Sequence, residues 1–157
     1  MALDAFVYCD CFEKDNLRSN PPGGIKIKIA PNGDITCDAP TAREWFAFSA
    51  WKQSKACAHP GMILKHHRLG NAAILDPLRT ELQQHSAAEY PILLQKILYS
   101  STHTCDWLPL ALLPQLTAEL KSLEPNGTPH AEALRHLKIQ LAELIIAAQM
   151  AHKPICF

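Results

Sequence analysis

The chain has 157 residues, of which 48% are apolar and 19% charged, and its 15 basic residues balance its 15 acidic ones. This length and composition suit one globular domain with its own hydrophobic core, so we expect residues 1–157 to form a single domain. The balanced charge provides no basic stripe for a phosphate backbone, which argues against a nucleic-acid partner.

The sequence also argues against a membrane or exported protein. No apolar run approaches the ~20 residues that a membrane-spanning helix needs. The N-terminus, MALDAFVYCD, lacks the basic region of a signal peptide. We therefore expect a cytoplasmic protein. In that reducing compartment its six cysteines are expected to be buried thiols or metal ligands rather than disulfides.

The N-terminal third of the chain predicts strands. Residues 3–13 alternate, and their odd positions, which include Cys9 and Cys11, form a small apolar face. Residues 25–30 also alternate strictly, with lysines on the outward face. The sequence PNGD that follows predicts a hairpin turn, and DITC is the returning strand.

A helix is predicted after the hairpin. Thr41 and Glu44 have the spacing of a capping box, and the helix is expected to run to about Lys55. The next apolar segment, GMILKHH, fits either a short strand or the lead-in to a helix. A further helix over residues 71–85 contains Asp76-Pro77, where we expect a kink or a restart.

The C-terminal half is mainly helical. Residues 90–101 fit a helix or a strand, and a helix is expected from near Pro109 to Leu123, with a first turn separated at Pro114. The last helix should be capped by Thr128 and extend to about Ala151, because leucines recur along it every three or four residues. The final segment, KPICF, predicts a short strand that returns to the sheet.

Cysteine and histidine gather in two short segments, YCDCFE and CAHPGMILKHHRLGN. One combination would give zinc three sulfurs and one nitrogen, a ligand set found in structural sites: Cys9, Cys11, Cys57 and His59. The usual spacing of two cysteine ligands in a structural zinc site is C-x2-C. On a strand, residues two apart have Cα atoms roughly 6.5 Å apart, whereas two sulfurs on one zinc are under ~4 Å apart. The spacing therefore favours core thiols, with zinc as the alternative.

Other chemistry has weaker support. Cys57 with His59, His66 or His67 as its base could act as a nucleophile, but no local signature accompanies it. His66, His67 and Arg68 are either solvated residues near a helix start or a surface that recognises carboxylates. Asp106 and Trp107 either begin a helix or anchor an interface.

Residues 90–123 combine Tyr-Pro, an apolar run, Ser and His, and an Asp-Trp pair that leads into a leucine-rich helix ending in AELKSL. This layout resembles the C-terminal half of small immunity proteins, which protect bacteria from polymorphic or contact-delivered toxins. The short strand after MALD is similar to the start of such proteins. The resemblance implies a small cytosolic α+β protein that binds one cognate toxin and catalyses no reaction.

We therefore predict an α+β fold, in which a small, mainly antiparallel sheet packs against three or four helices. The preferred function is binding of a cognate toxin protein, with no catalytic residue and no cofactor. The alternative is a structural or hydrolytic zinc protein that uses the three cysteines and His59. The expected contact residues form two patches: His59, His66, His67 and Arg68, and then His103, Asp106 and Trp107.

Overall fold

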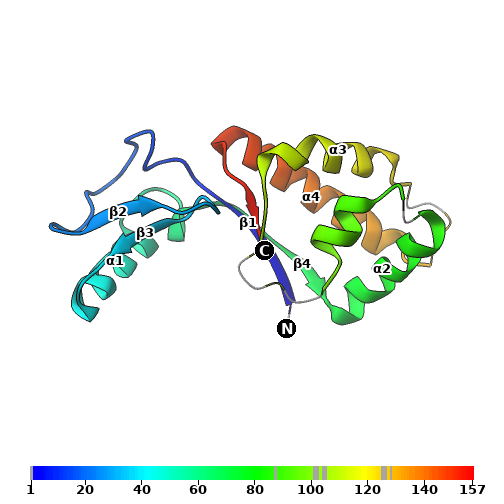
Figure 1. The fold of residues 1–157 in the computed structure, drawn as a ribbon, viewed down its shortest axis with the longest axis horizontal. Helices are drawn as coiled ribbons and strands as arrows, with labels where there is room; N and C mark the ends of the chain where they lie inside the picture. Colours follow the sequence, from blue (N-terminus) through cyan, green and yellow to red (C-terminus); the bar gives the residue numbers. More distant parts are fainter. Residues whose placement is uncertain (1, 87, 101–102, 104–105, 125–126, 128) are drawn as a thin grey trace.

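The computed structural model describes residues 2–86, 88–100, 103, 106–124, 127 and 129–157. Two lobes lie on either side of a central pair of antiparallel strands, β1 (Ala2–Tyr8) and β4 (Ile63–Asn71) (Figure 1). These strands belong to a four-stranded antiparallel sheet with the order β4-β1-β6-β5. The other two members are short: β6 (Ile155–Cys156) pairs with β1, and β5 (Trp107–Leu108) forms the edge beyond it.

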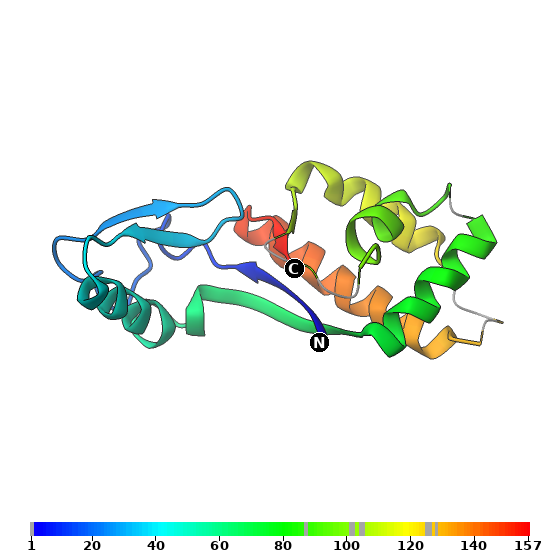
Figure 2. The ribbon, with the colours of Figure 1, turned by 60° about the horizontal axis from the view of Figure 1, so that its bottom comes forward.

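The small lobe is built from the chain between β1 and β4. The strands β2 (Lys26–Ile29) and β3 (Ile35–Asp38) form a separate two-stranded hairpin. Helix α1 (Ala42–Ser54) packs beside it, and a short 3-10 helix, η1 (Pro60–Met62), leads into β4. The hairpin and α1 extend from one end of the long β1–β4 pair (Figure 2).

The large lobe is helical and covers the other part of the sheet (Figure 1). Its long C-terminal helix packs directly on β1 and β4. In chain order its elements are α2 (Ala72–Ser86), the π-helical turn η2 (Leu93–Ile97), the 3-10 helix η3 (Leu110–Leu112), α3 (Leu113–Ser122) and α4 (Ala131–Ala151).

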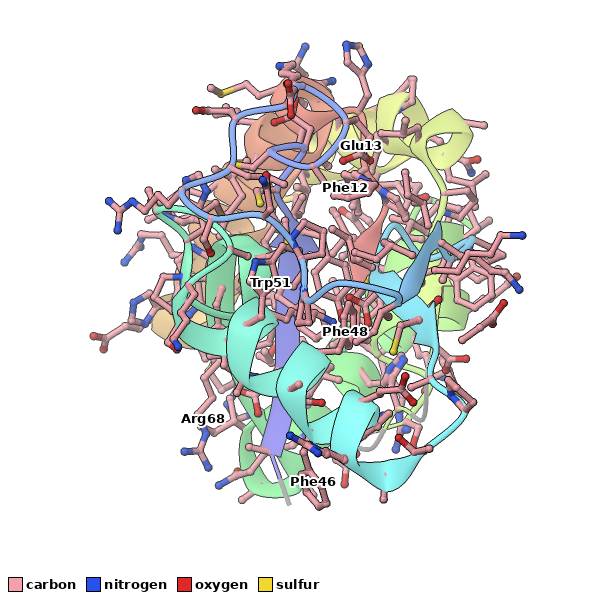
Figure 3. The ribbon with its side chains drawn as sticks, turned by 90° about the vertical axis from the view of Figure 1, so that its left-hand side faces the viewer. Phe12, Glu13, Phe46, Phe48, Trp51 and Arg68 are labelled. Atoms are coloured by element: carbon pink, nitrogen blue, oxygen red, sulfur yellow. The ribbon has the colours of Figure 1, made fainter. Side chains whose placement is uncertain are left out.

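Each lobe has its own buried cluster. The larger cluster joins the apolar face of β1 to α2, α3 and α4. The smaller one contains eight buried residues of the small lobe, and three of them are cysteines. Phe48 and Trp51 point inward from α1, with ring centroids 5.8 Å apart, while Phe46 points away from the lobe (Figure 3). The small-lobe cluster comprises Cys9, Cys11, Ile35, Phe48, Trp51, Ala56, Cys57 and Met62.

The predicted α+β class is confirmed, as are the hairpin, the terminal strand and the capping box. The Glu44 N–H donates to the Thr41 hydroxyl, and the Thr41 N–H donates to the Glu44 carboxylate, at 3.3 and 3.1 Å. The sequence fitted either a helix or a strand over residues 90–101, and within that segment Leu93–Ile97 form the helical turn η2. The predicted cap at Thr128 lies outside the described residues.

Two expectations were wrong. The first strand ends at Tyr8, not at residue 13. The β2–β3 hairpin pairs only with itself and does not join the main sheet. Of the kink or restart expected at Asp76-Pro77, the restart does not occur, because helix α2 continues through Pro77. Among the described residues, no helix combines the length and apolar character needed to cross a membrane.

Candidate metal centre

Two short segments meet where the central strands enter the small lobe. The first, Cys9 to Cys11, follows the end of β1, and the second, Cys57 to His59, lies between α1 and η1. The strand pairing brings them together, because Tyr8 is opposite Ile63 and the Cys9 N–H donates to the Met62 carbonyl at 2.8 Å.

The chain bends at the first segment. The ladder register shifts between Val7 and Tyr8, and after Tyr8 the extended strand gives way to a turn at Cys11. The Cys11 carbonyl accepts a hydrogen bond from the Asn16 N–H at 2.8 Å, which closes the turn. The backbone N–H of Cys11 lies against the sulfur of Cys9. The two cysteines therefore need not follow the up-and-down alternation of a strand.

The second segment has the same local arrangement. Helix α1 ends at Lys55, and the chain bends through Cys57. The N–H of His59 donates to the sulfur of Cys57 at 3.4 Å. In both segments the backbone N–H of residue i+2 thus faces the sulfur of residue i. Such N–H donors favour the thiolate form, which is the form that binds metals.

The four side chains converge on one point. The sulfur of Cys9 lies 3.7 Å from the sulfur of Cys57, and His59 Nδ1 lies 3.4 Å from the sulfur of Cys11 and 3.8 Å from that of Cys57. All four potential ligand atoms lie within 4.8 Å of one another. A tetrahedral zinc ion, with bonds of about 2.3 Å to sulfur and 2.0 Å to nitrogen, separates its ligand atoms by roughly 3.5–3.8 Å. The three distances of 3.4–3.8 Å match these separations, and the remaining pairs lie within 4.8 Å.

The site is mostly buried, and one of its residues remains accessible to solvent. The three cysteines are buried, whereas His59 is partly exposed. Burial raises the pKa of Cys9 above that of an ordinary thiol, and the neighbouring Cys57 raises it further; burial also raises the pKa of Cys11. Three thiols packed together cannot all ionise without a compensating charge, and a bound cation supplies that charge. The residues present therefore fit a metal ion.

The sequence argument against zinc was based on the wrong local structure. It placed Cys9 and Cys11 on a strand, where their Cα atoms would be too far apart, but the strand ends before both. The expectation that the thiols are buried is confirmed. The matched spacing of C-x-C and C-x-H was visible in the sequence. It could have indicated two equivalent turns that each present a pair of ligands.

The structure separates the first predicted contact patch. His59 belongs to the cysteine cluster, whereas His66, His67 and Arg68 lie on β4. His66 faces Asp4 on β1 at 3.3 Å, while His67 Nε2 lies 2.8 Å from Glu143 on α4. Arg68 is exposed and extends from the edge of the molecule (Figure 3). His66 and His67 point to opposite faces of the sheet, so they do not form one surface.

The second predicted patch does come together. Nδ1 of His103 lies 3.2 Å from the Asp106 carboxylate, which also accepts a hydrogen bond from the Tyr99 hydroxyl. The His103 side chain is fully buried, with Nε2 2.9 Å from the Ile97 carbonyl. Trp107 lies on β5 rather than in a helix and is 44% exposed. Asp106 and Trp107 border a pocket of about 230 Å³.

Comparisons with protein-family models, with curated proteins and with solved structures give no significant match.

Proposed function

We propose that this chain is a zinc-binding protein, in which Cys9, Cys11, Cys57 and His59 hold one structural Zn²⁺. The observation that carries the proposal is the convergence of four ligand atoms within 4.8 Å of one another, from two segments far apart in the sequence. Sulfur-rich ligand sets favour zinc over magnesium or calcium, which prefer oxygen.

A structural role fits better than a hydrolytic one. Catalytic zinc sites keep an open position for water or substrate, whereas structural sites are filled by four protein ligands. Here three sulfurs and one imidazole nitrogen would supply all four ligands. Nucleophilic catalysis by Cys57, with His59, His66 or His67 as its base, would need a free Cys57 sulfur, so occupation of the site by metal excludes it.

The small lobe benefits from such a metal. Its buried cluster has eight members, and three of these are the proposed ligands. Small hydrophobic cores commonly need a metal or disulfides to be stable. The ion would tie the end of β1 to the segment that follows α1, and so would fasten the hairpin and α1 to the central sheet.

Cobalt substitution tests the proposal. Protein refolded with one equivalent of Co²⁺ should show the visible absorption of tetrahedral cobalt and the near-ultraviolet charge-transfer bands of thiolate ligands. Added Zn²⁺ should displace the cobalt and abolish both signals. Purified protein should also contain about one zinc per chain by elemental analysis. Absence of zinc together with a cobalt spectrum that lacks thiolate bands would disprove the proposal.

Toxin neutralisation by binding is a second candidate. It is supported by the exposed Trp107, which stands beside Asp106 at the edge of a pocket and resembles the aromatic anchors of protein interfaces. A closed metal site agrees with a binding role, since it leaves the metal no catalytic position. Calorimetric titration with a toxin encoded by a neighbouring gene is the direct test, and Trp107→Ala should weaken that binding. If no product of a neighbouring gene gives a heat of binding, toxin neutralisation is excluded as the function.

A further inference from the structure

Helix α4 carries a second apolar stripe that faces solvent. Its first stripe, which includes Leu137, Leu141 and Leu144, is buried in the large lobe. The second consists of Ile139, Ala142, Ile146 and Met150, and its three large members are more than half exposed. Positions spaced by three or four residues lie on one face of a helix. Exposed apolar rows of this kind mark interaction surfaces.

The stripe borders a groove between α3 and α4, which lie side by side in Figures 1 and 2. The groove encloses about 440 Å³. The buried side chains of Leu120 and Ile145 form its floor, and Ala142 and Ile146 form one wall. A second hollow of about 270 Å³ lies on the other side of Ile146, towards Leu64 on β4. A ridge of side chains from another helix fits such a groove.

The charges at the groove are positive. Lys121 of α3 and Lys138 of α4 both line it. Lys138 Nζ donates to the Leu123 carbonyl at 2.9 Å. Within the described part of the chain, no carboxylate pairs with either ammonium. Glu143, which lines the neighbouring hollow, is already neutralised by Lys65 at 2.5 Å. The groove therefore presents an apolar floor beside unpaired positive charge.

We propose that the α3–α4 groove binds an amphipathic helix of a partner protein, whose apolar ridge covers Ile146 and whose flanking acidic residues pair with Lys121 and Lys138. This inference depends neither on the metal nor on the toxin. A second copy of the chain fits less well, because two identical faces would bring lysines against lysines. A lipid surface also fits less well, because it could contact the exposed stripe but could not fill the groove, whose residues Leu120 and Ile145 are recessed.

Two synthetic peptides test the proposal against the full, metal-loaded chain. Both are amphipathic helices of about 18 residues, or five turns, with leucine on one face. One peptide has glutamate flanking the leucines and the other has lysine. Fluorescence anisotropy should show that the acidic peptide binds and that the basic one binds at least about tenfold more weakly.

Two substitutions in the groove and one matched control test whether the peptide binds there. Ile146→Glu should lower the affinity for the acidic peptide by at least about tenfold, since it puts a charge in the centre of the contact. Its matched control, Ile74→Glu, changes another exposed isoleucine, on α2, and should leave binding unchanged. Lys121→Glu should reduce the preference for the acidic peptide. Circular dichroism checks that all three variants keep the fold.

Three outcomes would overturn the inference. If both peptides bind with equal affinity, or if neither binds, an acidic amphipathic helix is excluded as the partner. A dimer seen by sedimentation and abolished by Ile146→Glu assigns the groove to a second copy. Binding to phosphatidylglycerol vesicles that Ile146→Glu abolishes, with no peptide binding, assigns it to a membrane surface. Loss of acidic-peptide binding in Ile146→Glu but not in Ile74→Glu supports it.

Discussion

The sulfur of Cys9 lies 3.7 Å from the sulfur of Cys57, although 48 positions separate them in the chain. The pairing of β1 with β4 brings these residues together, and the bends after Tyr8 and after α1 turn both side chains to the same point. The central strand pair therefore positions the site, and the two turns complete it. The predictions on metal binding follow from this arrangement.

Cys57→Ser should abolish tight zinc binding. Loss of one of four ligands should lower the affinity by more than about a hundredfold, since changes outside the ligand set already cost roughly ten- to a hundredfold. Cys37→Ser is the matched control, because Cys37 packs against the same cluster but lies outside the group of four. Elemental analysis and competition with a fluorescent zinc indicator measure both variants. Equal zinc content in the two proteins would contradict the assignment.

Removal of the metal should loosen the small lobe and leave the large lobe intact. A chelator leaves three buried thiols with no cation, in a cluster of only eight buried residues. Hydrogen exchange should therefore accelerate in α1 and in the β2–β3 hairpin. The buried face of α4 belongs to the other cluster and should keep its protection. Uniform acceleration in both lobes, or none at all, would count against a local structural metal.

Local signals predicted much of the fold. The capping box of Thr41 and Glu44 is read from residues three apart, and the hairpin from a turn sequence between two alternating runs. The leucine stripe of α4 follows from its helical periodicity. Each of these features depends on neighbouring residues alone, so one sequence is sufficient to find it.

The site was harder to predict because its geometry is non-local. Alternation continues through Cys11, and the sequence pattern does not show that the strand ends at Tyr8. That end coincides with a register shift in the pairing with β4, which begins more than fifty residues later. The strand β5 was missed for the same reason, because its two residues form a strand only through their pairing with β6.

Replacing Glu119 should destabilise the large lobe. Its carboxylate is buried on α3 and accepts hydrogen bonds from the N–H groups of Ile92 at 2.8 Å and Leu93 at 2.9 Å, which begin η2. Glu119→Ala would leave both donors buried without a partner. We expect a loss of roughly 2–6 kcal/mol in the free energy of unfolding, because each of the two groups costs about 1–3 kcal/mol.

Urea denaturation measures this loss. Glu124→Ala is the control, because Glu124 is an exposed glutamate just beyond the end of α3. It should change the free energy of unfolding by less than about 0.5 kcal/mol. Similar stabilities for the two variants would show that the Glu119 hydrogen bonds contribute little to the fold.

The carboxyl group of Glu143 should titrate below the usual range of glutamate. Lys65 Nζ lies 2.5 Å from its carboxylate, and His67 Nε2 lies 2.8 Å from it. Their hydrogen bonds, that of Lys65 first, lower the pKa of Glu143 below 4.5. Carbon-13 NMR of the side-chain carboxyl should show this shift. Lys65→Met should move the pKa back towards 4.5, whereas Lys28→Met, which removes the partner of Asp38, should leave it unchanged.

The direction of the shift fixes the effect of pH on stability. Because the folded protein holds the Glu143 proton less tightly than the unfolded chain, the interaction stabilises the fold above the unfolded pKa. That contribution disappears as the pH falls below about 4.5 and through the lower folded pKa. The stability difference between the native chain and Glu143→Gln should therefore be present at neutral pH and shrink in acid. A difference that stays constant down to acid pH would show that Glu143 acts by packing rather than by charge.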